Sequence, residues 1–331
     1  MLLQGGYPYT AVLTVVALSV VGLPQGRSQE PRVAITPRAQ SGSAQKASSN
    51  IRVNTDLVLV PVLVTDSEDR AVTGLNREQF KLFEDKIEQP ITHFASEDSP
   101  ISVGIVFDGS GSMGAKLQKA KAAVTQFLST SNPDDEFFLV KFSDRAELVV
   151  DLTRESGEIQ NRLSFTRSRG RTALLDAIYL AMVQMKHAHN PRKALVLISD
   201  GGDNSSRYTM GDIKNQIREA DVQIYSMGIF EPLYRDGLSP EELAGPGLLN
   251  NISRQSGGRF FNVADLNDLP EIASKIGSAL RNQYVIGFSP AAPTRDGKYH
   301  RITVKLVHPK GVPPLRAFFR RGYVSPVSAP Q

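Results

Sequence analysis

Between residues 99 and 282, the hydrophobic positions follow two different spacings. Continuous apolar runs predict buried strands, whereas apolar residues three or four positions apart predict helices that pack by one face. The runs cover residues 101–107, 136–142, 146–152, 194–199 and 222–229, and the helical spacings cover 117–128, 175–185 and 269–280. Because strands alternate with helices, we expect an α/β fold with a doubly wound, mostly parallel sheet covered by helices on both faces.

The segments on either side of this unit carry strand patterns without helices. The predicted strands cover residues 57–64, 90–94, 283–289, 299–307 and 315–319. The first two could pair with each other, and the polar stretch between them has room for one more short strand. Pro61 cannot donate a ladder hydrogen bond, which predicts an edge strand or a bulge at that position. One small β-sandwich formed by the two flanking segments, with the α/β unit inserted, would bury all of these strands.

The chain begins with an apolar segment that predicts export. Residues 10–23 are almost wholly apolar, and this length suits a signal-peptide core but is shorter than the roughly 20 residues of a membrane span. We therefore expect a secreted or periplasmic protein without a transmembrane span in the mature chain. The expected parts are a signal peptide at 1–29, a disordered linker at 30–50, the two halves of the sandwich at 51–97 and 283–325, the α/β domain at 98–282 and a tail at 326–331.

Composition and charge narrow the possible functions. The 38 basic and 34 acidic residues give a net charge of +4, which is too small and too evenly spread along the chain to predict a nucleic-acid partner. The sequence contains no cysteine, which excludes disulfides, thiolate metal sites and a cysteine nucleophile.

Oxygen-bearing side chains gather where predicted strands end. Asp108, Ser110 and Ser112 follow the strand at 101–107, separated by glycines that allow a tight turn. Thr172 and Asp200 stand at later strand or helix ends. In an open parallel sheet, ligands collect outside the carboxyl ends of the strands. Carboxylate and hydroxyl oxygens are donors that Mg²⁺ prefers, so these residues predict a metal site.

This pattern closely resembles the metal-ion-dependent adhesion site of the von Willebrand factor type A family, over about residues 98–282. The family motif reads Asp-x-Ser-x-Ser, then a Thr, then an Asp after a later strand, and Asp108, Ser110, Ser112, Thr172 and Asp200 fill it. The resemblance implies that the hydroxyls bind the metal directly and that the carboxylates act largely through water. It also implies an open position for an acidic residue of a protein partner. The expected function is metal-dependent binding or adhesion without catalysis, with Mg²⁺, or alternatively Mn²⁺ or Ca²⁺.

The flanking segments resemble those of a bacterial exported subgroup of the same family. GLNREQFKLFEDKIEQPITHF precedes the α/β unit and RNQYVIGFSP follows it. Three arginines, Arg167, Arg169 and Arg171, come immediately before Thr172. Covalent reach places Arg171 beside the predicted metal, so we expect a basic rim that favours acidic partners.

Other interpretations of the same turn predict different chemistry. Gly109, Gly111 and Gly114 match a dinucleotide-binding pattern, although the Asp108 carboxylate would repel a pyrophosphate. Ser112 as the nucleophile of a serine hydrolase would need a histidine base, which only His300 or His308 could supply in the required order.

Two further interpretations do not involve binding of a partner through a metal. In the first, the protein is a structural subunit of an envelope complex, and the metal only stabilises the fold. In the second, Asp108 and the serines merely cap a helix. Asp203, close to Asp200, is expected to be a solvated turn residue.

Overall fold

The centre of the fold is a six-stranded sheet in the order β10-β9-β8-β5-β6-β7. The computed structural model describes residues 57–96, 98–230, 239–290, 296–307 and 314–327. The strands of this sheet are β5 (Ile101–Asp108), β6 (Glu136–Phe142), β7 (Ala146–Thr153), β8 (Arg192–Ser199), β9 (Gln223–Ile229) and β10 (Phe260–Val263). All neighbouring pairs are parallel except β6 and β7, which form an antiparallel pair. The predicted doubly wound, mostly parallel sheet is confirmed.

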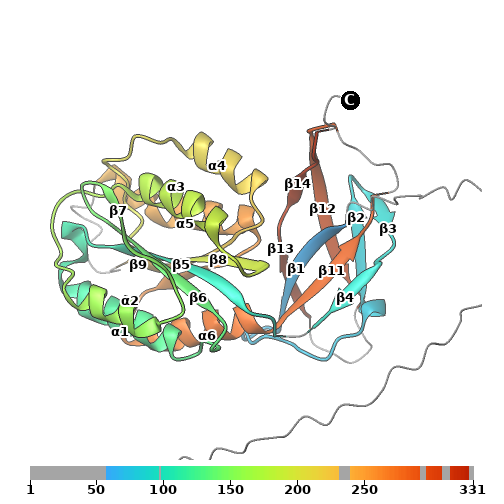
Figure 1. The fold of residues 1–331 in the computed structure, drawn as a ribbon, viewed down its shortest axis with the longest axis horizontal. Helices are drawn as coiled ribbons and strands as arrows, with labels where there is room; N and C mark the ends of the chain where they lie inside the picture. The colour runs from blue at the N-terminus through green and yellow to red at the C-terminus, as the bar shows by residue number, and fades with distance from the viewer. Residues whose placement is uncertain (1–56, 97, 231–238, 291–295, 308–313, 328–331) are drawn as a thin grey trace, which may run out of the picture. The chain divides into compact units, whose positions relative to one another are not determined.

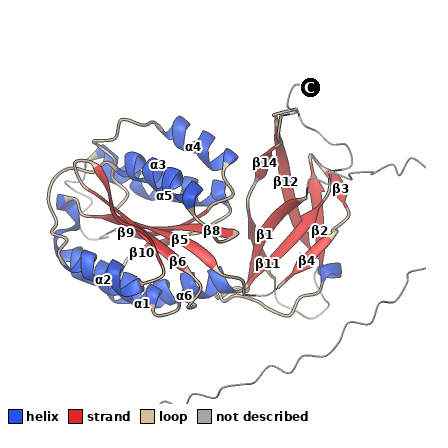
Figure 2. Ribbon diagram, in the orientation of Figure 1, coloured by secondary structure: helices blue, strands red, loops and turns tan. Residues whose placement is uncertain are grey.

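Helices cover both faces of this sheet (Figures 1 and 2). On one face lie α1 (Leu117–Leu128), α2 (Ser156–Ser164) and α6 (Leu269–Arg281), and on the other lie α3 (Leu174–Gln184), α4 (Met210–Glu219) and α5 (Pro240–Ser256). Short 3-10 helices are η1 (Arg77–Gln79), η2 (Gly111–Lys116), η3 (Met185–His187) and η4 (Leu266–Asp268).

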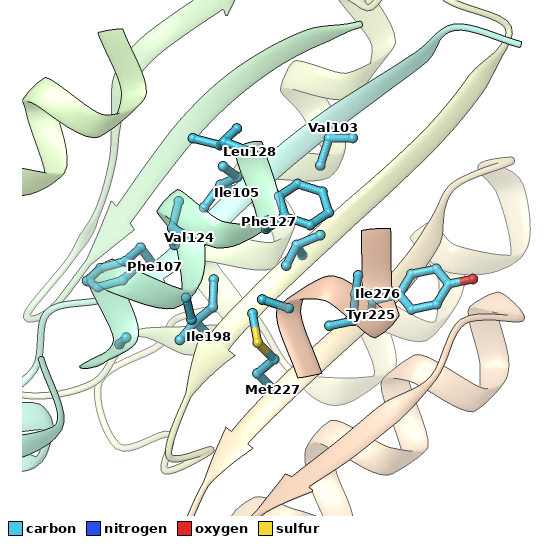
Figure 3. Close-up of a cluster of buried hydrophobic side chains, with 14 of the residues drawn as sticks. Val103, Ile105, Phe107, Val124, Phe127, Leu128, Ile198, Tyr225, Met227 and Ile276 are labelled. Carbon is cyan, nitrogen blue, oxygen red and sulfur yellow. The ribbon is translucent and has the colours of Figure 1, made fainter. Parts of the chain in front are cut away.

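The core under α1 and α6 shows why β5 reads as a continuous apolar run. Val103, Ile105 and Phe107 point to this face, where Val124 of α1 and Ile276 of α6 pack against the sheet (Figure 3). The residues between them on β5 face the other helical layer, so every position of the strand is buried. Burying a side chain of this size contributes about 1.5–3 kcal/mol, and this holds the end of β5 in a fixed place.

The two flanking segments form two four-stranded sheets, in the orders β13-β1-β11-β4 and β14-β12-β2-β3. The strands are β1 (Val58–Thr65), β2 (Phe80–Glu84), β3 (Ile87–Gln89), β4 (His93–Ala95), β11 (Gln283–Phe288), β12 (Tyr299–Leu306), β13 (Arg316–Phe319) and β14 (Gly322–Val324). Each sheet contains strands from both flanks, and one apolar cluster packs between the sheets. The predicted flanking strands therefore form, with two short strands, β2 and β3, where one was expected, and with β14, which was not predicted.

The strand pairing in the sandwich also differs from expectation in two ways. Strand β4 pairs with β11 and not with β1. Strand β1 is not an edge strand, because it lies between β11 and β13. Pro61 is tolerated there because the pairing with β13 begins only at Val62. On the β13 side the carbonyl of Leu59, two residues earlier, instead accepts a hydrogen bond from the Arg320 side chain at 2.6 Å.

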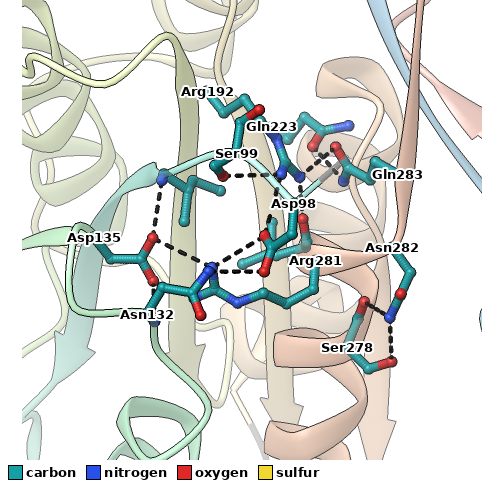
Figure 4. A network of polar contacts seen from close by, with 12 residues as sticks. Asp98, Ser99, Asn132, Asp135, Arg192, Gln223, Ser278, Arg281, Asn282 and Gln283 are labelled. Carbon is teal, nitrogen blue, oxygen red and sulfur yellow. Dashed lines mark hydrogen bonds and ion pairs between the residues drawn. The ribbon is translucent and has the colours of Figure 1, made fainter. Parts of the chain in front are cut away.

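A buried polar network lies where α6 leads into β11 (Figure 4). The Asp135 carboxylate accepts the backbone N–H of Ile101 at 3.0 Å and pairs with Arg281. Arg192 donates to the backbone carbonyl of Leu280 and, at 3.3 Å, to the side-chain oxygen of Gln283, the first residue of β11. This network fixes the start of the second sandwich segment at the amino-terminal edge of the parallel sheet.

The predicted signal peptide and linker lie outside the described residues. Among the residues that the structure describes, no helix is long and apolar enough to span a membrane. The expected boundaries at 97/98 and 282/283 fall between elements, since β4 ends at Ala95, β5 begins at Ile101, α6 ends at Arg281 and β11 begins at Gln283.

Candidate metal centre

Asp108 is the last residue of β5 and is completely buried. One carboxylate oxygen accepts the backbone N–H of Ser110 at 2.8 Å. The other accepts the hydroxyl of Ser199, the last residue of the neighbouring strand β8, at 2.6 Å. These two hydrogen bonds hold the carboxylate at the carboxyl ends of two adjacent parallel strands.

The turn after β5 brings two serine hydroxyls together. The Oγ atoms of Ser110 and Ser112 are 3.0 Å apart. Ser110 is buried, whereas Ser112 is exposed at the start of η2. Met113, which follows, is completely buried in the core under α1 and anchors the turn. The hydroxyl pair therefore extends from the interior to the surface.

Thr172 follows a loop that is hydrogen-bonded to the same turn. The backbone N–H of Gly111 donates to the carbonyl of Gly170, and the N–H of Arg169 donates to the carbonyl of Gly109, both at 2.9 Å. Thr172 is 5% exposed, and its hydroxyl forms no hydrogen bond with any residue that the structure describes. Thr172, with its unbonded hydroxyl, thus stands two residues after Gly170, which contacts the turn that carries Ser110 and Ser112.

Two glycines allow this close packing. Gly170 has a φ of 82°, and a Cβ there would lie 2.6 Å from a carboxylate oxygen of Asp144. Gly201, next to Asp200, has a φ of 78°, and a Cβ there would lie 2.8 Å from the backbone of Gly245 in α5. At Gly201 a larger residue would combine left-handed strain with a backbone clash. At Gly170 it would suffer the same strain and would displace the Asp144 carboxylate, which accepts the backbone N–H of Arg171.

Asp200 follows β8 and is 5% exposed. Its Oδ2 atom lies 3.4 Å from the ammonium nitrogen of Lys116, whose side chain is 12% exposed. Its Oδ1 atom is buried and has no hydrogen-bond donor among the described residues. A buried acceptor without a donor costs free energy unless a cation or water occupies its vicinity.

The electrostatics of this edge of the sheet favour a cation. Burial and, to a lesser extent, the charge of Asp200 raise the pKa of Asp108 to about 7. No cluster of three or more His, Cys, Asp or Glu side chains within the described ranges could hold a metal, so any centre here depends on hydroxyl oxygens too. Two neighbouring carboxylates, an unpaired carboxylate oxygen and three hydroxyls suit a hard divalent cation.

The three predicted rim arginines, Arg167, Arg169 and Arg171, are exposed. The guanidinium of Arg171 donates to the backbone carbonyl of Asn204, so this arginine is tied to the segment after β8. Phe165, in the same loop, is 82% exposed. The surface next to the candidate centre therefore combines positive charge with an apolar ring.

Sequence reasoning missed three residues that shape the site. Ser199 holds Asp108, and Lys116 faces Asp200. The side-chain oxygen of Asn204 accepts a hydrogen bond from the backbone N–H of Thr172 at 2.9 Å. The backbone N–H of Asn204 donates to the Thr172 carbonyl at 3.0 Å. No local pattern marks these contacts. The composition of the Asp200-Gly-Gly-Asp-Asn stretch was the one available signal for Asn204.

The expectation that Asp203 is a solvated turn residue is wrong. The residue is half-buried, and its Oδ1 atom accepts the backbone N–H of Leu174 at 2.9 Å and the hydroxyl of Ser206 at 2.5 Å. Burial raises the pKa of Asp203 despite these hydrogen bonds. The first N–H groups of α3, which begins at Leu174, have no acceptor within the helix. Asp203 supplies one, and this contact holds its side chain against the start of α3 and away from solvent.

The structure weakens the dinucleotide interpretation. The backbone N–H of Gly109 donates to the carbonyl of Phe142 at 2.8 Å, and that of Gly111 donates to Gly170. A pyrophosphate bound at this turn would need these N–H groups as donors.

The histidines that a serine hydrolase would require are not brought to the turn by any described contact. His300 lies in β12, with its ring nitrogens 2.9 Å from Asp85 and 3.3 Å from Asp296. These carboxylates belong to the flanking segments and not to the α/β unit. His308 lies outside the described residues.

The fold and this arrangement define a doubly wound α/β domain with an oxygen-rich edge at the carboxyl ends of β5 and β8. Residues 103–202 match the family model described as von Willebrand factor type A domain. This match supports the membership of the α/β unit in that domain family.

Two curated proteins share sequence with the chain. An uncharacterised protein of Borreliella burgdorferi is 29% identical over 182 residues, which make up 49% of this chain and 53% of that protein. Inter alpha-trypsin inhibitor, heavy chain 4 of Mus musculus is 31% identical over 153 residues, or 41% of this chain and 16% of that protein. The chain thus spans about half of the first relative and a smaller share of the second.

Several solved structures are similar at low identity. A von Willebrand factor type A protein from Catenulispora acidiphila is 15% identical, with a TM-score of 0.48 over 81% of this chain and 74% of that one. The vWF domain of the type V pili tip protein Mfa5 from Porphyromonas gingivalis is 14% identical, with a TM-score of 0.43 over 55% of this chain and 95% of that one. Neither is close enough to transfer a ligand or a partner to this chain.

Proposed function

We propose that the α/β domain binds a protein partner through a divalent cation held by Asp108, Ser110, Ser112, Thr172 and Asp200. Mg²⁺ is the proposed ion because all five side chains offer hard oxygens, and Mn²⁺ or Ca²⁺ are the alternatives. The domain-family match supports a role in protein–protein interaction or adhesion. We propose this role as the function, without catalysis, in a secreted or periplasmic protein.

One observation carries this proposal. Asp200 has a buried carboxylate oxygen without a hydrogen-bond donor in the described structure, and its charge helps to raise the pKa of the buried Asp108. Without a cation, the fold keeps two mutually repelling carboxylates near each other, with only Lys116 paired to one of them. Such an arrangement is costly unless it serves to bind positive charge.

Different residues of the chain have different roles in the proposed site. Ser199 and the Ser110 backbone orient the Asp108 carboxylate, and the glycines keep the turn and the 166–171 loop close together. When bound, the cation supplies a coordination position for a carboxylate of the partner. Ser112 is exposed, so this edge can be reached from solvent. The arginine rim would attract an acidic surface and raise the rate of encounter.

Isothermal titration calorimetry with Mg²⁺ and Mn²⁺ tests the metal site. We expect one bound ion, and a loss of affinity of more than about tenfold in Asp108→Ala, because the variant removes a carboxylate from the centre. Asp134→Ala is the matched control, since it removes an exposed carboxylate paired only with Arg154 at the surface. Equal metal affinity in Asp108→Ala and the control would show that the site is misassigned.

A structural role for the metal is the second candidate function. It is favoured by the Ser199 hydrogen bond, which makes Asp108 part of the contact between β5 and β8. Chelation separates the two candidates. A structural metal predicts a large loss of thermal stability on chelation, whereas an adhesive metal predicts loss of partner binding in a pull-down from envelope extract with little change in melting temperature.

A further inference from the structure

Two neighbouring cavities at the amino-terminal ends of the parallel strands are lined by arginines, whereas the candidate metal centre lies at the carboxyl ends. The first, of about 410 Å³, lies beside Val222, just before β9, and is bordered by α4, β12 and the β13–β14 connection. The second, of about 340 Å³, lies beside the end of α5 and along β13. Arg321 lines both cavities, so they adjoin at this residue, and we call their combined lining the arginine surface. The arginines of this surface are Arg218, Arg254, Arg259, Arg301, Arg316, Arg320 and Arg321.

The positive charge of this arginine surface is largely unbalanced. Among the described residues, Asp221 and Asp69 are the only acidic ones that line the two cavities. Asp221 pairs with Arg320 at 3.1 Å, and Asp69 pairs with Arg259 at 2.7 Å. The other five arginines form no ion pair with any residue in the described part of the chain. Seven arginines against two aspartates leave a local excess of five positive charges, compared with a net charge of +4 for the whole chain.

Aromatic rings hold several of these arginines without neutralising them. The guanidinium of Arg218 lies 5.4 Å from the ring centre of Tyr299, and that of Arg321 lies 5.2 Å from the ring centre of Phe319. A ring attracts a guanidinium through its quadrupole but carries no net charge. The donors of these arginines are therefore oriented in advance and still lack an anion.

The chemistry of the surface selects the kind of anion. The guanidinium group presents a planar fork of donors that matches the oxygens of a phosphate group and binds it in a bidentate manner. Each cavity is large enough for one such group with its neighbouring atoms. Two cavities joined by Arg321 favour a chain of anionic groups over a single ion. Phe319 is buried, and Arg218 lies over the ring of the 40% exposed Tyr299, so the surface offers no row of open rings for the base stacking that single-stranded nucleic acids need.

We propose that this arginine surface binds a linear phosphate polymer, with at least one phosphate group in each cavity. The surface lies near the amino end of β9, whereas Asp108 and Asp200 lie at the carboxyl ends of β5 and β8. A strand of seven residues is roughly 20 Å long, so the two sites are separate and can be occupied together. The inference does not depend on the proposed metal centre.

A pair of matched variants tests the proposal. Arg218→Gln/Arg301→Gln/Arg321→Gln removes three exposed arginines from the surface. The control, Arg145→Gln/Arg154→Gln/Arg162→Gln, removes the same charge from exposed positions at the two ends of β7 and in α2, away from both proposed sites. Binding of fluorescently labelled linear polyphosphate is measured by anisotropy in low salt with a chelator, because polyphosphate itself binds divalent cations. We expect at least about tenfold weaker binding by the surface variant, since each charge-assisted hydrogen bond is strong, and a near-parental affinity for the control.

Three further probes identify the ligand chemistry. We expect that inorganic phosphate competes only weakly, and that poly-glutamate and single-stranded oligonucleotides of equal charge bind less tightly than polyphosphate. Equal losses of affinity in the two triple variants would reduce the effect to net charge and overturn the site. Tighter binding of poly-glutamate or of the oligonucleotide would overturn the phosphate polymer as the ligand. Melting temperatures of both variants, measured by circular dichroism, establish that they are folded.

Discussion

The ammonium nitrogen of Lys116 lies 3.4 Å from a carboxylate oxygen of Asp200, although 84 residues separate the two in sequence. Both side chains are largely buried. Lys116 ends η2, which begins in the turn that carries Ser110 and Ser112, so the same local structure places a positive charge and the candidate metal ligands next to each other. The lysine therefore acts as an internal counterion that a divalent cation must oppose or displace.

Lys116→Met should raise metal affinity and lower the stability of the metal-free protein. Removing the ammonium group removes its repulsion of the bound cation, and we expect a gain of about tenfold in Mg²⁺ affinity for charges this close. The same change leaves Asp200 without its counterion, which should lower the melting temperature in the presence of a chelator. Calorimetry and thermal unfolding measure the two effects.

Lys119→Met is the control for this prediction. Lys119 lies one turn further along, in α1, is exposed, and donates to the Asn267 side chain. It should change neither quantity appreciably. Lower metal affinity in Lys116→Met than in the parent would mean that the lysine supports the site and does not compete with the cation.

The arginine rim should affect association and not metal binding. Once a partner is known, Arg167→Gln/Arg169→Gln/Arg171→Gln should slow association at low salt, because exposed charges steer the encounter. Metal affinity should stay similar or rise slightly. Arg171 is partly held by the Asn204 carbonyl, so its share of the steering should be smaller than that of the other two. Equal association rates for variant and parent at low ionic strength would remove the rim from recognition.

The sequence predicted β5, β6, β8 and β9 because these strands are buried on both faces and read as continuous apolar runs, but it did not predict the four-residue strand β10. It also did not predict α2 and α4, which have only two buried residues each, or α5, which contains Pro246 in its interior. The start of α5 did carry a usable signal, since Ser239 and Glu242 form a capping box. Helices that bury few side chains leave a weak periodicity, and this limits prediction more than helix length does.

The sequence was enough to propose the oxygen-bearing residues of the candidate site, but not the contacts that join distant segments there. Asp108, Ser110 and Ser112 stand in one local motif and Asp200 directly follows a strand, which one sequence can show, whereas Thr172 stands in the loop before α3. The contacts of Lys116 with Asp200 and of Asn204 with Thr172 join segments 84 and 32 residues apart. Such contacts depend on the order of the strands in the sheet, which hydrophobic spacing does not encode. Pro61 illustrates the same limit, because its tolerance depends on where the pairing with β13 begins.

Ile286→Ala should destabilise both flanking segments. Ile286 is completely buried in the sandwich core, and its strand β11 pairs with β1 on one side and β4 on the other. We expect a loss of about 2–5 kcal/mol, because the cavity left in a packed core adds to the lost burial. Faster amide exchange should appear in β1 as well as in β11. Leu59→Ala, at a 37% exposed position of β1, is the control and should cost much less.

His300 should make the stability of the sandwich depend on pH. Its ring nitrogens lie 2.9 Å from Asp85 and 3.3 Å from Asp296. Burial lowers the pKa of His300, but the hydrogen bonds and charges of the two carboxylates outweigh this and raise it above its ordinary value of 6.5. The folded state therefore holds the proton more tightly than the unfolded chain, and the protonated histidine stabilises the fold.

The sign of the effect follows from this difference. The contribution of His300 is fully present below about pH 6.5 and is lost as the pH rises through the higher pKa of the folded state. The free energy of unfolding, measured with urea at several pH values, should therefore differ most between parent and His300→Gln near pH 5–6 and least near pH 9. Asp85→Asn, which removes the nearer carboxylate, should reduce this pH dependence while keeping the histidine. If the difference between parent and His300→Gln were constant from pH 5 to pH 9, the two carboxylates would not hold the histidine proton, and its contacts in β12 would serve packing alone.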